Sequence, residues 1–376
     1  MSDGFMPFAK RAEEKNSIPS DLFLVLQETG FKYQVQIMDK HLITTLLLEK
    51  GLFKNKNIEY IPLRGGVSSD IFLVTDGNQK FVVKQALSKL QVEDDWYADP
   101  SRNQTEQKFI RYISRYLPEN VPRILYSDAS NGFFVMEFLG PVFQNWKEQL
   151  LQGKVVKETV KKAAELLSIL HLRSWQNKVA EQEFDTTSNF KSLRIEPYLI
   201  TTGNRHPGLK KQFYAEALRL ETQRTALVHG DFSPKNMMVS PDRLVLLDHE
   251  VAWYGDPAFD VAFFLNHLYL KQLYHVRSPQ SMPDLARIAW DNYYENLGPS
   301  YAEELETGIS RLLLMLMLAR VDGKSPVEYL DEIQKEFIRS FVYPMLTREA
   351  FNLADIRSNW NSQLETFQSG ESGNKP

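Results

Sequence analysis

The residues best suited to chemistry lie in one short stretch, LVHGDFSPKNMMV, at positions 227–239. Its apolar ends predict two short buried strands, and the polar loop between them carries Asp231 and Asn236. A second apolar run, LVLLD, follows closely and ends on Asp248. Neighbouring strand ends would bring two carboxylates and an amide oxygen together. Because Mg²⁺ prefers such oxygen ligands, the pattern indicates a site for a hard cation.

The spacing of Asp231 and Asn236 indicates phosphoryl transfer. In kinases, a loop of the form D-x-x-x-x-N supplies an aspartate that accepts the proton of the attacking hydroxyl and an asparagine that holds a metal ion. A second aspartate from a later strand holds the other metal, and Asp248 has the right place for that role. The alternative is a loop of water-facing polar residues, which the flanking His229–Gly230 pair and Glu250 disfavour.

A phosphoryl-transfer site also needs a cation for the nucleotide phosphates, and Lys84 in FVVKQA is the candidate. A lysine within an apolar strand must pair with an acid or face a polar cleft, because burying an unpaired charge is costly. Glu106 shares a predicted helical face with apolar residues, so a Lys84–Glu106 pair would satisfy both charges. Two alternatives stay open: Lys84 lies on an edge strand while Glu106 reaches solvent, or Lys84 pairs with the acidic turn at 93–95.

The segment LRGGVSSD connects the first two predicted strands. Its Gly65, Gly66 and Ser68 would let backbone N–H groups approach nucleotide phosphates, as anion-binding nests do. The segment is not a G-x-G-x-x-G loop, and most Gly-Gly turns only reverse the chain. Its position ahead of the Lys84 strand is what favours a role in phosphate binding.

Composition restricts the class of protein. The chain has 376 residues, of which 43% are hydrophobic and 24% charged, as in ordinary globular proteins. Its net charge of −4, without a strong basic block, argues against nucleic acid as a partner. The chain has no cysteine, which excludes disulfides and thiolate metal sites. We see no signal peptide, and the most apolar run is too short for a bilayer span of about 20 residues, so we expect a cytoplasmic protein without a membrane segment.

Hydrophobic periodicity divides the chain into a β-rich part and an α-rich part, which is an α+β organisation. After an N-terminal extension, 1–57, runs such as DIFLVTD, KFVVKQA and FFVMEFL predict strands within 58–139. Residues 140–361 show helical spacing, and the tail 362–376 has the composition of a disordered segment. Helices are expected in 158–173, 208–222, 257–275, 283–296, 300–320 and 326–342.

These motifs resemble those of the aminoglycoside phosphotransferase and choline kinase-like family. The segment HGDFSPKN is similar to the family pattern H-G-D-x-x-P-x-N, and LLDHEVAWYGDPAFDVA is similar to I-D-x-E…G-D-P-x-x-D-L-A. FVVKQAL also resembles the corresponding segment of methylthioribose kinases. The resemblance covers roughly residues 58–340. It implies a protein-kinase-like fold with a small β-rich N-lobe, 58–139, and a larger, mainly α-helical C-lobe, 140–361.

The resemblance also implies a nucleotide site. The co-substrate would be ATP or GTP, with its base against the backbone of Glu137, Phe138 and Leu139. Lys84, held by Glu106, would bind the phosphates.

For the catalytic end of the site, the resemblance implies Asp231 as the catalytic base. Asn236 and Asp248 would bind Mg²⁺, with Glu250 as a further acid beside the metal. Asp260 would brace the catalytic loop, and His229 would orient that loop rather than carry a proton. Lys235 either reaches a phosphate or faces solvent.

The short path after Asp248 favours a small acceptor. Only HEVAWYG separates Asp248 from Asp256, which with Pro257 predicts the start of the next helix. This leaves no room for an activation loop that docks a peptide. We therefore expect a kinase that phosphorylates a hydroxyl of a sugar, an amino sugar or an aminoglycoside-like compound. A nucleotide-binding regulator of the same fold that catalyses no transfer is the alternative.

Overall fold

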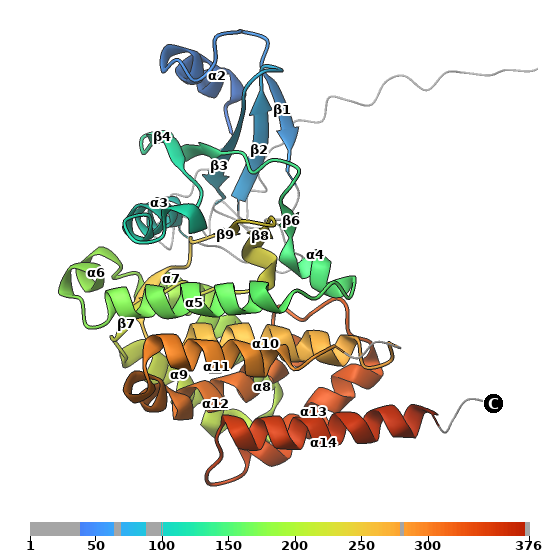
Figure 1. Ribbon diagram of the computed structural model, residues 1–376. Coiled ribbons are helices and arrows are strands. Elements are labelled where there is room, and N and C mark those ends of the chain that lie inside the picture. Colours follow the sequence, from blue (N-terminus) through green and yellow to red (C-terminus); the bar gives the residue numbers. More distant parts are fainter. Residues whose placement is uncertain (1–37, 64–68, 88–98, 100, 279–281, 373–376) are drawn as a thin grey trace, which may run out of the picture. The chain divides into compact units, whose positions relative to one another are not determined.

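The strands predicted within 58–139 form one antiparallel sheet of order β1–β2–β3–β5–β4 (Figure 1). Lys84 pairs with Ile71 on one side and Phe134 on the other, so β3 is an inner strand. The alternative of an edge-strand Lys84 is therefore wrong. The bounds are β1 Glu59–Pro62, β2 Ser69–Thr75, β3 Lys80–Ala86, β4 Ile124–Asp128 and β5 Phe133–Glu137.

The computed structural model describes residues 38–63, 69–87, 99, 101–278 and 282–372. Three features expected from the sequence lie outside these ranges. They are most of the N-terminal extension, the loop with Gly65, Gly66 and Ser68, and the acidic turn at 93–95.

Two helices accompany the sheet. α2, Lys40–Glu49, begins where the Asp39 side chain accepts the N–H groups of His41 and Leu42. It buries Ile43 and Leu47 in a small core shared with the sheet. α3, Arg102–Ile113, carries Glu106 on its buried side and ends before a short 3₁₀ turn, Pro118–Asn120.

The rest of the described chain is mainly helical, as predicted. α10 packs against α12, and α5 packs against α11 (Figure 1). α10 is apolar on nearly every side because it is surrounded by other elements. The helices are α4 Trp146–Leu151, α5 Lys157–Ser174, α6 Lys178–Glu183, α7 Thr187–Phe190, α8 Thr201–Arg205, α9 Lys210–Thr222, α10 Ala258–Tyr274, α11 Leu285–Leu297, α12 Pro299–Asp322, α13 Glu332–Leu346 and α14 Leu353–Ser372.

Five very short strands position the polar loop 229–236, which we call the motif loop, within this helical part of the chain. β8 Met237–Val239 pairs with β6 Gln144–Asn145 and β9 Leu244–Leu246, while β7 Ala226–Val228 pairs with β10 Trp253–Gly255. Of the two strands that flank the motif, β7 is fully buried, as the sequence predicts, whereas β8 is buried at Met237 and half-buried at its other two residues. The motif loop is therefore held at both ends by backbone hydrogen bonds.

A π-helix, Lys191–Ile200, was not foreseen from the sequence. It contains Pro197 and lies between α7 and α8. Such helices are rare and are frequent at functional sites. This one carries Arg194, which contacts the motif loop.

The prediction of a disordered tail from residue 362 is wrong for residues 362–372, which belong to α14. Trp360, fully buried, contacts Tyr269, Phe337 and Phe341 edge-on, and Leu364 is buried one turn later. These apolar residues have helical spacing, but the polar residues between them dominate the composition of the segment. The boundary expected at 361 thus falls inside a packed helix.

Across the described residues, no helix combines the length and apolar character needed to cross a membrane.

We expect Trp360→Ala to lower the free energy of unfolding by about 3–5 kcal/mol, because it removes a large side chain from a packed site. Urea unfolding measures the change. Leu218→Ala is the control, since Leu218 is 64% exposed and its loss should change the free energy by less than about 0.5 kcal/mol. Equal effects of the two substitutions would contradict the packed position of α14.

Candidate active site

The motif loop begins with a glycine that no other residue replaces easily. Gly230 has φ of +77°, and a Cβ there would lie 2.7 Å from the carbonyl oxygen of Val251. The fully buried Asp260 carboxylate accepts the backbone N–H groups of His229 at 2.6 Å and Gly230 at 2.9 Å. These bonds confirm the prediction that Asp260 braces the loop.

His229 is fully buried and links the loop to the end of β9. Its Nδ1 accepts the Asp231 backbone N–H at 3.1 Å, and its Nε2 lies 3.2 Å from the Leu247 carbonyl oxygen. A carbonyl only accepts, so Nε2 carries the proton and the ring is neutral. Burial lowers the pKa of His229, which favours the same state. His229 orients the loop, as predicted.

Asn236 connects the two halves of the motif. Its side-chain amide donates to the Asp231 backbone carbonyl oxygen at 3.0 Å, and its backbone carbonyl oxygen accepts the Leu247 N–H at 2.8 Å. Asp248 follows directly, with φ of +64°. A left-handed backbone at a residue other than glycine costs energy and is concentrated at functional sites.

Lys84 reaches its predicted partner Glu106 and also Asp248, which the sequence pattern assigns to a metal ion instead. Its Nζ lies 2.8 Å from a carboxylate oxygen of Glu106 and 2.7 Å from Oδ1 of Asp248. The lysine is 3% exposed. Burial disfavours its charge, but the carboxylates of Asp248 and Glu106 raise its pKa above the ordinary value. The predicted Lys84–Glu106 pair is confirmed.

A third acid completes the cluster. Glu106, Asp248 and Glu250 each offer a carboxylate oxygen within 4.8 Å of the other two. Burial raises the pKa of Glu106. At Asp248 burial acts in the same direction, but the charges of Lys84 and Lys235 together lower the pKa of that carboxyl below its ordinary value. Arg102 Nε donates to Glu250 at 3.1 Å. Carboxylate oxygens are ligands that Mg²⁺ prefers; of these three acids, Glu106 is already bound to Lys84, which leaves Asp248 and Glu250 as the better candidates.

A pocket of about 310 Å³ opens beside these residues. Lys84, Glu106, Lys235, Asn236 and Asp248 line its polar end. Leu63, Ile71, Val82, Pro122, Met136, Met238 and Leu247 provide its apolar lining, and Glu137, Phe138, Leu139 and Asn145 complete it. The predicted nucleotide residues that the structure describes therefore share one pocket.

The Glu137 side chain plays a structural part at the edge of this pocket. It forms a salt bridge with Arg243 at 2.8 Å and accepts the Arg123 backbone N–H at 3.0 Å. The Glu137 backbone N–H donates to the Arg123 carbonyl oxygen at 2.9 Å, while Phe138 and Leu139 continue the pocket lining beyond β5.

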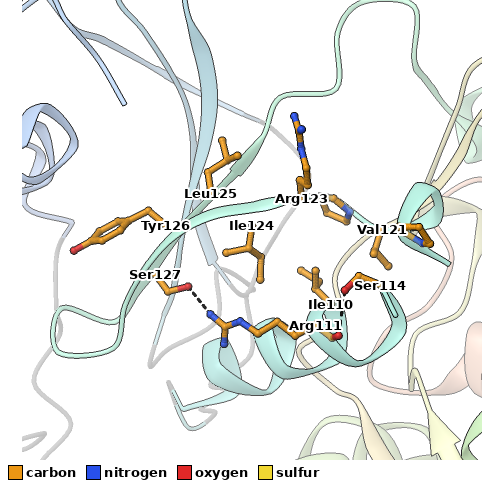
Figure 2. Close-up of a pocket in the computed structure, with 11 residues that line it drawn as sticks. Ile110, Arg111, Ser114, Val121, Arg123, Ile124, Leu125, Tyr126 and Ser127 are labelled. Atoms are coloured by element: carbon orange, nitrogen blue, oxygen red, sulfur yellow. Dashed lines mark hydrogen bonds between the residues drawn. The ribbon is translucent and has the colours of Figure 1, made fainter. Parts of the chain in front are cut away.

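A second pocket, of about 550 Å³, lies between α3 and β4. Figure 2 shows Arg111 reaching toward Ser127, whose Oγ accepts its N–H at 2.8 Å. The described lining residues of this pocket include no carboxylate and no histidine. It therefore lacks the carboxylates that a Mg²⁺ site or a catalytic base of this kind needs, and the smaller pocket is the candidate site.

Arg194 is a site residue that sequence reasoning missed. Its Nη2 lies 3.2 Å from Oδ2 of Asp231, and its Nε donates to the Gly230 carbonyl oxygen. Although burial disfavours its charge, the Asp231 carboxylate raises the pKa of Arg194. The arginine thus fixes both the backbone and the carboxylate of the loop. The only signal in the sequence is a lone arginine in SLRIEPYL.

Known proteins share this architecture. The methylthioribose kinase of Geobacillus thermodenitrificans (strain NG80-2) is 26% identical over 259 residues, covering 61% of this chain and 65% of that kinase. The match thus spans less than two thirds of the relative. Choline kinase from Cryptosporidium parvum Iowa II aligns with a TM-score of 0.51 at 13% identity, over 82% of this chain and 99% of that one. Plasmodium vivax ethanolamine kinase aligns with a TM-score of 0.50 at 13% identity, over 89% and 97%.

These structural likenesses show a protein-kinase-like fold, which confirms the predicted two-lobed α+β organisation. The resemblance drawn from HGDFSPKN and the segment after Leu246 is confirmed as well, by a match to a family profile. The model of the phosphotransferase enzyme family matches residues 59–280, more than half of the chain, and the chain therefore belongs to that family.

Proposed function

We propose that this protein transfers the γ-phosphate of ATP to a hydroxyl group of a small molecule with a sugar-like skeleton. One observation carries the proposal. Lys84, Asn236 and Asp248 line one pocket, and the Asn236 amide is bonded to the backbone of Asp231. A phosphate-binding cation, metal-binding oxygens and a candidate base are thereby joined in one hydrogen-bonded unit.

The pocket suits a nucleotide. Its apolar lining would hold the base between residues of the sheet, such as Val82, and Met238 of β8 with Leu247, the residue that follows β9. The backbone of Glu137, Phe138 and Leu139 would recognise the base edge, and Lys84 would bind the phosphates.

Asn236, Asp248 and Glu250 would hold Mg²⁺. When bound, the cation would neutralise charge that develops on the nucleotide phosphates. Glu250 is already bonded to Arg102, so its contribution would come from the oxygen that this arginine leaves available.

Asp231 would align the acceptor hydroxyl with the γ-phosphorus and accept its proton. The acceptor oxygen forms a bond to the γ-phosphorus, and the bond from that phosphorus to the oxygen bridging the β and γ positions breaks. ADP leaves with the bonding electron pair, and the proton passes from Asp231 to solvent. Most of the rate enhancement would come from positioning and electrostatic stabilisation.

The acceptor is proposed to be small for a structural reason. The segment between Asp248 and α10 contains β10, which pairs with β7, so this described stretch has no free loop on which a peptide could dock. A sugar-like skeleton is proposed because relatives of this chain are methylthioribose kinases, named for a ribose derivative.

We expect Asp231→Asn to lower the rate of ADP formation with an acceptor by about 10²–10⁴-fold, because the acceptor loses its base. ATP binding, measured by calorimetry, should persist, since Asp231 does not line the nucleotide pocket. Asp242→Asn, at an exposed turn, is the matched control and should keep full activity. Full turnover in Asp231→Asn would sink the assignment of the base.

Lys84→Met should lower the free energy of unfolding by about 3–5 kcal/mol, because it leaves the buried Glu106 carboxylate and the partly buried Asp248 carboxylate without their cation. Adding Glu106→Gln removes one of those carboxylates and should recover part of the loss. Urea unfolding measures stability and calorimetry measures ATP affinity, which should fall in both variants. A double variant no more stable than Lys84→Met would contradict a charge-pair role for Glu106.

A further inference from the structure

A group of basic side chains lies outside the nucleotide pocket, and Lys271 is its most unusual member. This lysine of α10 is 1% exposed. Its one hydrogen bond to another described residue is a long one, 3.4 Å to the His267 carbonyl oxygen of the same helix. No described carboxylate lies within salt-bridge distance of it. Burying a lysine without an acid is costly, so the position calls for an explanation.

The neighbours of Lys271 are also short of partners. Its Nζ lies 5.3 Å from the centroid of the Tyr329 ring, and the Oη of that tyrosine is buried without a partner in the described structure. The Nε of Arg320, near the end of α12, is also buried without a partner in the described structure. Its Nη1 donates to Tyr198 at 3.2 Å and to Ser325. We call Lys271, Arg320 and Lys147, together with Tyr329, the basic cluster.

Glu328 is the acid that faces this cluster. It forms a salt bridge with Lys147, and its side chain is 66% exposed. The pKa of Lys271 falls to about 7 because of burial and then the charges of Lys147 and Arg320, which Glu328 opposes. Three basic side chains, of which Lys147 and Arg320 are fully charged at pH 7, thus meet one acid that lies mostly in solvent. The cluster has an excess of positive charge and several donors without acceptors.

The basic cluster adjoins the candidate catalytic residues on two sides. The Tyr198 ring centroid lies 5.9 Å from the guanidinium carbons of both Arg194 and Arg320, and Arg194 holds Asp231. On the other side, Lys147 follows Asn145, whose amide donates to the backbone carbonyl of Lys235 in the motif loop at 2.6 Å. A molecule bound at the cluster would therefore lie next to the loop that carries the base.

We propose that the basic cluster binds the acceptor and that the acceptor carries an anionic group, a carboxylate or a phosphate, in addition to the hydroxyl that is phosphorylated. Such a group would supply acceptors for Lys271, Arg320 Nε and Tyr329 Oη together. A polycationic acceptor would meet like charges and be disfavoured. The identification of the bound molecule as the acceptor rests on the proposed function, but the binding of an anion at the cluster does not depend on phosphate transfer.

Binding is the first test, with the full chain and D-gluconate as the probe. Calorimetry should detect binding of gluconate to the unmodified chain and at least a tenfold weaker affinity in Lys271→Met and Arg320→Gln. Lys154→Gln, at an exposed position, is the matched control and should bind normally. Equal gluconate affinity in all four proteins would overturn the inference. So would the absence of binding to the unmodified chain of both gluconate and inorganic phosphate.

Misfolding of the variants can be told apart from loss of the site. Lys271→Met replaces an unpaired buried charge with an apolar side chain of similar length, so its urea midpoint should rise while gluconate binding falls. A structural role for Lys271 would instead lower the midpoint.

Transfer is the second test, and it separates this inference from the proposed function. ADP formation is measured with glucose, glucosamine, gluconate, glucuronate and glucose 6-phosphate. The three anionic compounds should give a kcat/KM at least tenfold above glucose and glucosamine, and the carboxylates and the phosphate ester distinguish the two kinds of anion. Preference for glucosamine would overturn the inference. Absence of ADP formation with every acceptor would count against the proposed function, while the binding result would still decide the inference.

Discussion

The structure depends on one buried ammonium group. Lys84 of the inner strand β3 binds Glu106 of α3 and Asp248 beyond β9. A single charge therefore joins the sheet, its helix and the segment that follows β9. Arg102 adds a second cation against Glu250. Among the groups in direct contact, two cations therefore face three carboxylates, and one negative charge is left over when all three are ionised; Lys235 acts on Asp248 from further away. That surplus is met by a proton, consistent with the raised pKa of Glu106, or by a metal ion.

The motif loop is rigid for a related reason, because its polar groups are buried and bonded. Asp260 accepts two backbone N–H groups, His229 bridges to Leu247, and Arg194 binds both Gly230 and Asp231. Buried networks of this kind are stable only when their members are satisfied. The loop is thus preorganised before any ligand arrives, as positioning catalysis requires.

The site residues that could be predicted from the sequence are those whose neighbours or spacing indicate a specific role. Lys84 and Glu106 each lie among apolar residues, where an isolated charge demands a partner, and Asp231 and Asn236 have a spacing tied to one chemistry. Arg194 could not be found this way, because it lies on a π-helix whose spacing differs from 3.6 residues per turn. Lys271 was also missed, since a lysine near the end of an apolar helix normally reaches solvent. Whether it lies inside is decided by how α10 packs against other helices, which composition does not report.

The α14 helix shows the same limit from the other direction. Its residues from 362 onward are polar on average, yet Leu364 among them is buried, and Trp360 one turn earlier packs against Phe337 of α13 and Tyr269 of α10. The average describes the exposed side of the helix, whereas packing depends on the few residues of its inner side. Spacing is therefore more informative than composition for a helix that covers a core edge.

The left-handed backbone of Asp248 has a consequence for how this position can vary. Few residues besides glycine adopt positive φ readily, and asparagine and aspartate are the main exceptions. Glycine would relax the turn but lose both the lysine partner and an oxygen donor. Asparagine would keep the turn and lose the charge, while glutamate would keep the charge and strain the turn. Backbone shape and electrostatics thus select the same amino acid independently, which leaves this position almost no neutral route to change.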